Sequence, residues 1–82
     1  MTPPPLFPFH DPTEALEAAA AAYRAAVIAA HNAATRSRLT RRDRDATGRE
    51  IARANQASLD ARRALEHARD QLVAAALEHT GV

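Results

Sequence analysis

Between Thr13 and Thr35 more than half of the residues are alanine, and none is glycine or proline. Alanine has the best intrinsic helix propensity and loses no side-chain entropy, so this segment is predicted to be helical. Alanine also buries little apolar area, which means that such a helix gains stability by approaching another helix closely. The chain is therefore expected to form helices that lie against other helices.

The first helix is predicted at about 12–40. Asp11 is a suitable N-cap, Pro12 suits the first helical position, and Glu14 stands three residues after the cap. The apolar residues recur at spacings of three and four, which predicts one buried face. These residues are Leu16, Ala19, Ala20, Tyr23, Ala26, Val27, Ala30, Ala33 and Ala34. A polar stripe with a seven-residue repeat is expected to be solvated, and it comprises Glu17, Arg24, His31 and Arg38.

The second helix is predicted at about 48–79, after an arginine-rich turn at about 40–47. Two capping boxes could begin it, Thr40 with Asp43 or Thr47 with Glu50, and Gly48 favours the second. Gly81 is expected to end it.

The second helix has a heptad pattern in which long residues alternate with alanine. One core position holds Ile51, Ser58, Leu65, Leu72 and His79, and the other holds Ala54, Ala61, Ala68 and Ala75. The predicted fold is all-α, an antiparallel two-helix hairpin that forms an alanine-rich coiled coil. Ser58 is interpreted as a small residue that permits close packing, whereas Asn55 beside the core is either a device that fixes register or an ordinary polar residue.

Residues 1–10 contain four prolines and are expected to form an extended arm. The arm also carries Leu6, Phe7 and Phe9, which a solvated tail would normally lack. We expect the arm to pack as a strap on the hairpin or on a neighbouring subunit. A polyproline ligand for an aromatic groove is the less favoured alternative.

An 82-residue chain without cysteine cannot use disulfides or thiolate metal sites to reinforce a small core. We therefore expect it to be completed by oligomerisation, or by docking on a partner protein within a larger assembly. The residues expected to bind that partner are apolar and lie in the arm or outside the predicted core. They are Leu6, Phe7, Phe9, Ile28, Leu59, Val73 and Leu77.

Basic charge is concentrated in the middle of the chain, because residues 36–53 hold seven arginines and three acids. A hairpin tip with several guanidinium groups suits phosphate contact, which makes nucleic-acid binding the alternative function. The candidate residues are Arg36, Arg38, Arg41, Arg42 and Arg44. Asp43 and Asp45 interrupt the cluster and no aromatic residue is interleaved for base stacking, so we favour protein binding.

Several other classes of function lack the residues that they need. The four histidines have no metal-ligand spacing, and the paired carboxylates have no accompanying base or nucleophile. We expect no metal, no cofactor and no enzymatic activity. The N-terminal residues do not form a signal peptide and no segment is apolar enough to span a membrane, so we expect a cytoplasmic protein without a membrane partner. The leading interpretation is a non-catalytic assembly or accessory protein that acts through helix–helix contacts, and it extends to a small subunit of a larger complex or particle.

Overall fold

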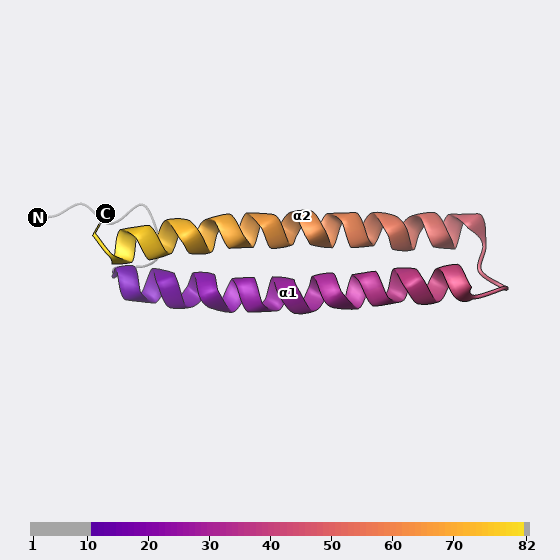
Figure 1. The fold of residues 1–82 in the computed structure, drawn as a ribbon, viewed down its shortest axis with the longest axis horizontal. Coiled ribbons are helices and arrows are strands. Elements are labelled where there is room, and N and C mark those ends of the chain that lie inside the picture. The colour runs from indigo at the N-terminus through magenta and orange to yellow at the C-terminus, as the bar shows by residue number, and fades with distance from the viewer. Residues whose placement is uncertain (1–10, 82) are drawn as a thin grey trace, which may run out of the picture.

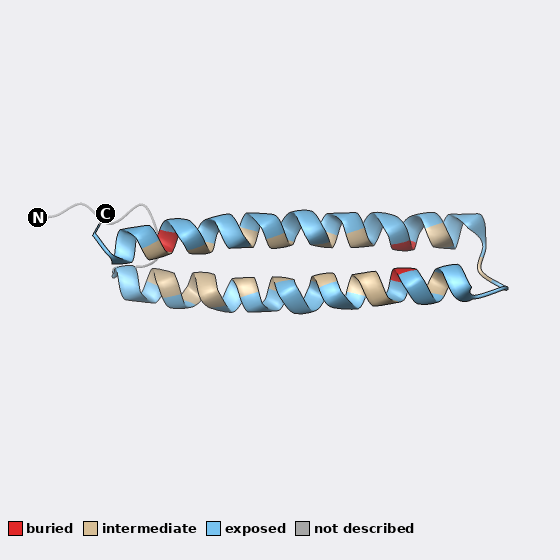
Figure 2. Ribbon diagram, viewed as in Figure 1, coloured by how far each residue is buried: buried red, intermediate tan, exposed pale blue. Residues whose placement is uncertain are grey.

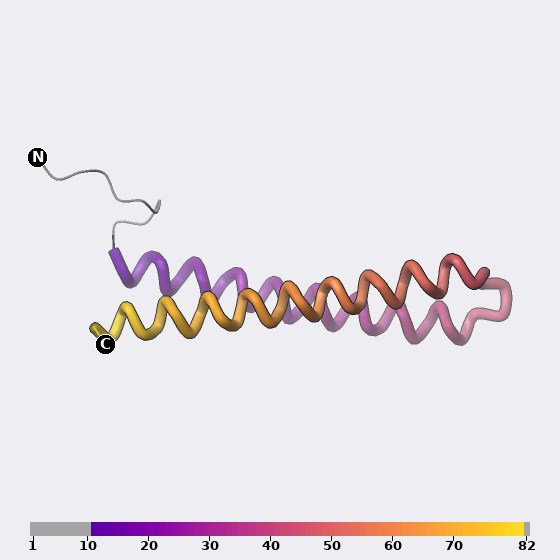
Figure 3. Tube along the Cα trace, turned by 90° about the horizontal axis from the view of Figure 1, so that it is seen from above, coloured from indigo at the N-terminus to yellow at the C-terminus, as the bar shows by residue number. Residues whose placement is uncertain are grey.

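The computed structural model describes residues 11–81, which form two α-helices joined by a short loop (Figure 1). α1 comprises Pro12–Arg42 and α2 comprises Gly48–His79. The helices run antiparallel along their whole length, and seen from above they cross at a small angle (Figure 3). The prediction of an all-α helical hairpin is confirmed.

Both helices begin at the polar caps that the sequence provides. The Asp11 carboxylate accepts the Thr13 N–H at 2.6 Å, and the Thr47 hydroxyl accepts the Glu50 N–H at 3.1 Å. Thr40, the alternative start of the second helix, lies inside α1 and donates its hydroxyl to the carbonyl four residues earlier. The chain therefore turns back after Arg42 and not before it.

The C-terminal ends of the helices are capped by backbone hydrogen bonds, and one aspartate side chain adds a further bond in the loop. Asp43 caps α1 through its N–H, and its carboxylate accepts the Asp45 N–H at 2.9 Å. Asp43 thus shapes the loop, a role that the charge pattern alone did not indicate. Gly81 has a φ of 76°, a conformation that favours glycine, and it ends α2 as expected.

The buried and half-buried residues follow one line along the facing sides of the two helices (Figure 2). We call this line the seam. Its α1 residues are Leu16, Ala19, Tyr23, Ala26, Ala30, Ala33, Ser37 and Thr40, and its α2 residues are Ile51, Ala54, Ser58, Ala61, Leu65, Ala68, Leu72 and Ala75.

Of the residues that were expected in the seam, Ala20 and Ala34 are half-buried at its edge, whereas Val27 and His79 are exposed. Val27 is 41% exposed, because it stands four residues after Tyr23 at the edge of the contact. His79 is exposed because it is the last residue of α2 and lies beside the beginning of α1, where little of that helix remains to cover it.

Ser37 is the most buried residue that the structure describes, with 4% of its surface exposed. Its hydroxyl donates to Asn55 Oδ1 at 2.6 Å, the one side-chain hydrogen bond between α1 and α2 in residues 11–81. This bond favours the interpretation of Asn55 as a device that fixes register within the hairpin. A slip by one turn would separate the two groups and leave the serine hydroxyl buried without this partner.

The register set by this bond matches large side chains with alanine. Counting outward from Ser37 and from Ala54, the seam residue next to Asn55, places Leu65 level with Ala26 and Tyr23 level with Ala68. Towards the loop, between Ala30 and Ser37, both helices present only alanine and serine. The loop half of the seam consequently depends on close approach of the two backbones and not on large side chains.

We expect the Ser37–Asn55 bond to couple the two residues energetically. In a double-mutant cycle with Ser37→Ala and Asn55→Ala, the coupling free energy of unfolding should be about 0.5–1.5 kcal/mol. Urea unfolding followed by circular dichroism measures it, and the cycle cancels the gain in helix propensity from each alanine. Additive effects of the two substitutions would contradict a register role.

Enlarging the small half of the seam should destabilise the hairpin. Ala54→Leu places a large side chain at a position that is 9% exposed, and the expected loss of stability is about 1–3 kcal/mol. Ala64→Leu is the matched control, because it makes the same change at an exposed position of α2. Equal melting temperatures for the two variants would show that the helices do not depend on close approach here.

Candidate protein-interaction surface

The hairpin leaves many of its large apolar side chains in contact with solvent. In residues 11–81 the exposed ones are Val27, Ile28, Leu39, Leu59, Val73 and Leu77. Four of them were predicted to bind a partner, and the structure places each of those four on the surface. The other predicted contacts, Leu6, Phe7 and Phe9, lie outside the described residues. Val27 and Leu39 were not predicted as surface contacts.

The seam divides the surface of the hairpin into two broad faces. On α1, one face holds the residues that come one or four positions after a seam residue of the seven-residue series, which is Leu16, Tyr23, Ala30 and Ser37. It also holds the α2 residues that follow Ile51, Ser58, Leu65 or Leu72 in the same way, because antiparallel helices present equivalent heptad positions on the same side. The opposite face holds the residues that precede these seam positions by one or follow them by two. A shallow depression lined in part by Arg36, Glu50 and Ala57 lies on that second face.

Three of the exposed apolar residues share the first face. Val27 comes from α1, and Leu59 and Val73 come from one stripe of α2, about 21 Å apart along the helix. We call this surface the valine–leucine face. Leu77 borders it one helical turn beyond Val73. The structure thus places Leu59 and Val73 of the predicted set on one stripe of α2, with Leu77 beside it.

The remaining two exposed apolar residues point elsewhere. Ile28 lies on the side of α1 that is turned away from α2, and Leu39 belongs to the opposite face. The opposite face is otherwise built largely from alanine, including Ala22, Ala29 and Ala64, so we call it the alanine face. Ile28 is therefore not continuous with the contacts on α2.

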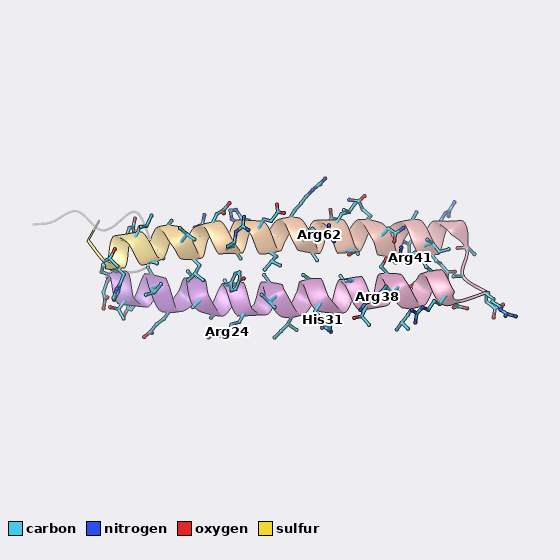
Figure 4. The ribbon with its side chains drawn as sticks, in the orientation of Figure 1. Arg24, His31, Arg38, Arg41 and Arg62 are labelled. Atoms are coloured by element: carbon cyan, nitrogen blue, oxygen red, sulfur yellow. The ribbon has the colours of Figure 1, made fainter. Side chains whose placement is uncertain are left out.

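The valine–leucine face also collects positive charge. Arg24, His31 and Arg38 follow α1 at seven-residue intervals, Arg41 lies nearer the loop, and Arg62 comes from α2 (Figure 4). All of these side chains are exposed. The polar stripe predicted from the sequence is therefore confirmed as exposed, and it forms one border of the apolar patch.

The arginines near the loop lie on different sides of the hairpin. Arg38, Arg41 and Arg42 line one shallow depression, whereas Arg36 lies on the alanine face and Arg44 lies in the loop. In residues 11–81 the one ion pair joins Arg69 and Asp70 at 3.7 Å. The guanidinium groups of the cluster consequently have no carboxylate within ion-pair distance among these residues.

The described residues offer little else that chemistry could use. In residues 11–81 no three histidine, cysteine, aspartate or glutamate side chains gather closely enough to hold a metal ion. No helix in this part of the chain is long and apolar enough to cross a membrane. The depressions beside Arg41 and beside Ala57 are open, shallow surfaces on the outside of the hairpin.

Comparison with known proteins leaves the surface as the main source of information about function. No protein-family model matches the chain, and neither the curated proteins nor the solved structures contain a match.

Ser37 and Val27 mark what sequence reasoning missed. Ser37 continues the seven-residue series of Leu16, Tyr23 and Ala30, so the spacing alone was sufficient to place it in the seam. Val27 lies at the edge of the apolar face of α1. Whether α2 covers a residue at this edge depends on the register between the two helices.

Proposed function

We propose that this protein is a non-catalytic assembly protein that acts through helix–helix contacts, as a coiled-coil hairpin completed by further copies or by a larger complex. The observation that carries the proposal is the contrast between a seam that buries no large side chain and an outer surface that exposes six of them. A helical hairpin with this distribution resembles half of a larger bundle.

The energetics favour covering the valine–leucine face. Val27, Leu59 and Val73 are each 41–53% exposed, so burying the remainder contributes roughly 1 kcal/mol per side chain. Small domains without disulfides or metals have little stability to spare, and a few kcal/mol is a large share of it. The partner would therefore stabilise the hairpin as well as bind to it.

Placing charge on the end of this surface should prevent association. We expect Val73→Asp combined with Leu77→Asp to reduce the mass in solution to that of a monomer, because each carboxylate would lose its hydration on burial. Light scattering coupled to size exclusion measures the mass, and circular dichroism checks that helicity is retained.

The matched control is Ala57→Asp combined with Ala64→Asp, which adds the same charge to exposed positions on the alanine face. This control should associate as the unmodified chain does. Unchanged assembly of the Val73 and Leu77 variant would refute the proposed surface, and loss of assembly in the control alone would move the contact to the alanine face.

A second candidate function is nucleic-acid binding by the loop end of the hairpin. It is favoured by one observation, that Arg38, Arg41 and Arg42 lie together without a carboxylate partner in residues 11–81. Guanidinium groups arranged in this way suit phosphate contacts that carry no base specificity.

Nucleic-acid binding by this cluster predicts a steep salt dependence. Each phosphate that the protein neutralises lowers the logarithm of affinity by about 0.9 per logarithm of salt concentration for duplex DNA. Arg41→Gln, Arg42→Gln and Arg44→Gln together should abolish a gel shift while leaving the melting temperature nearly unchanged. Arg24→Gln, Arg63→Gln and Arg69→Gln provide the control with equal loss of charge, and equal effects of both triple variants would argue against a site at the loop.

A further inference from the structure

The charge of the hairpin is polarised along its length. The end opposite the loop, residues 11–23 and 70–81, carries five acidic residues and no arginine. The loop end, residues 36–53, carries seven arginines and three acidic residues. A second hairpin lying alongside in the reverse direction would therefore set each basic end against an acidic end.

The valine–leucine face has its apolar residues where such a reversed copy would meet them. Val27 is the midpoint of α1, so a two-fold axis through the middle of the hairpin places it against its own counterpart. Leu59 lies about 7 Å from the middle of α2 on the loop side, and Val73 lies about 14 Å from it on the other side. Reversal brings Leu59 of one copy to about 7 Å, along the helix, from Val73 of the other.

Four charged residues on this face also form complementary pairs. Glu17 stands ten residues before Val27 and Arg38 stands eleven after it, so the reversed copy brings Glu17 level with Arg38. On α2, Arg62 and Glu66 lie on either side of the middle. In the reversed arrangement Arg62 of one copy therefore comes level with Glu66 of the other. Within one hairpin none of these four side chains has an ion-pair partner among the described residues.

We propose that two copies of this chain pack antiparallel through their valine–leucine faces and form a four-helix bundle with two-fold symmetry. This inference rests on the proposed function and specifies its partner. The parallel arrangement would place arginine-rich ends side by side, and self-repulsion disfavours it. On the alanine face, reversal would instead bring Glu50 near Glu78, which places like charges together.

The available area suits a stable dimer. Each helix is about 47 Å long and about 10 Å wide, so one face of the hairpin offers about 900 Å². A standard protein interface buries about 800 Å² on each partner. A full-length contact between two hairpins therefore reaches the usual size for a specific complex.

Charge exchange between two variants tests the arrangement directly. The first variant carries Glu17→Arg and Glu66→Arg, and the second carries Arg38→Glu and Arg62→Glu. Each should be a monomer on its own, because every proposed pair becomes a like-charge pair. An equimolar mixture should form a heterodimer with twice the monomer mass, since every pair again joins opposite charges.

The control moves the same charges to the alanine face. One control variant carries Glu50→Arg and Glu78→Arg, and the other carries Arg36→Glu and Arg53→Glu, so the net charges of the two mixtures are equal. Each control variant should remain a homodimer. Rescue that occurred equally with the controls would show general charge attraction and would overturn the inference.

Cysteine crosslinking tests the direction of packing, and the absence of native cysteine makes the result clean. Under mild oxidation Val27→Cys should form a disulfide dimer, whereas Ile28→Cys, which is more exposed, should not. Ala20→Cys and Ala34→Cys lie seven residues on either side of Val27, so they should crosslink when mixed. Crosslinking of Ala20→Cys with itself would indicate parallel packing and would overturn the proposed arrangement.

The failure of this inference can be distinguished from failure of the proposed function. A monomeric, partly unfolded chain would overturn self-pairing while leaving docking on another protein in place. A monomer that is fully helical, and whose unfolding is unaffected by Val73→Asp with Leu77→Asp, would overturn both.

Discussion

The distance at which α1 can approach α2 governs the rest of the structure. Ala30, Ala33 and Ser37 on one helix, facing Ala54, Ser58 and Ala61 on the other, leave no room for a large side chain between the backbones. Close approach gains dispersion contacts along the whole helix, but it removes little apolar area from water. The same choice of residues therefore makes a narrow seam in this stretch, and Val27, Leu59 and Val73 lie on the outer surface instead.

A narrow seam needs some other means of fixing its register. Alanine layers differ little from one another, so sliding by one turn would exchange one small-residue layer for a similar one. The Ser37–Asn55 hydrogen bond breaks this degeneracy, because a buried hydroxyl without a partner costs about 1–3 kcal/mol. Leu65 and Tyr23, each level with an alanine, add steric selection at the middle of the hairpin and on the side away from the loop. Polar and steric selection thus act in different halves of the hairpin.

The two helices and their caps were predictable from the sequence, whereas the contacts between the helices were less predictable. Helix propensity and the caps at Asp11 and Thr47 are properties of short segments, and they predicted the two helices. The heptad pattern placed Leu65 and Leu72 in the seam for the same reason. Whether Asn55 had a partner, and whether Val27 was covered, depended on the register between two helices, which a single sequence does not state. The candidate surface was accordingly predicted on α2, where the pattern is regular, and was incomplete on α1.

The two candidate functions share one of their arginines, so self-association and nucleic-acid binding would compete with each other. Arg38 would pair with Glu17 of a second copy, and it also lines the depression that suits phosphate. Pairing of two hairpins therefore removes one guanidinium from the loop cluster, while Arg42 and Arg44 stay near the ends of the bundle. A partner that binds only the folded hairpin also stabilises it. The fraction of folded chain, the fraction of dimer and the exposure of the arginines should therefore all change with protein concentration. A rise in protein concentration would favour the bundle, and it would leave a smaller basic patch at each end for any polyanion.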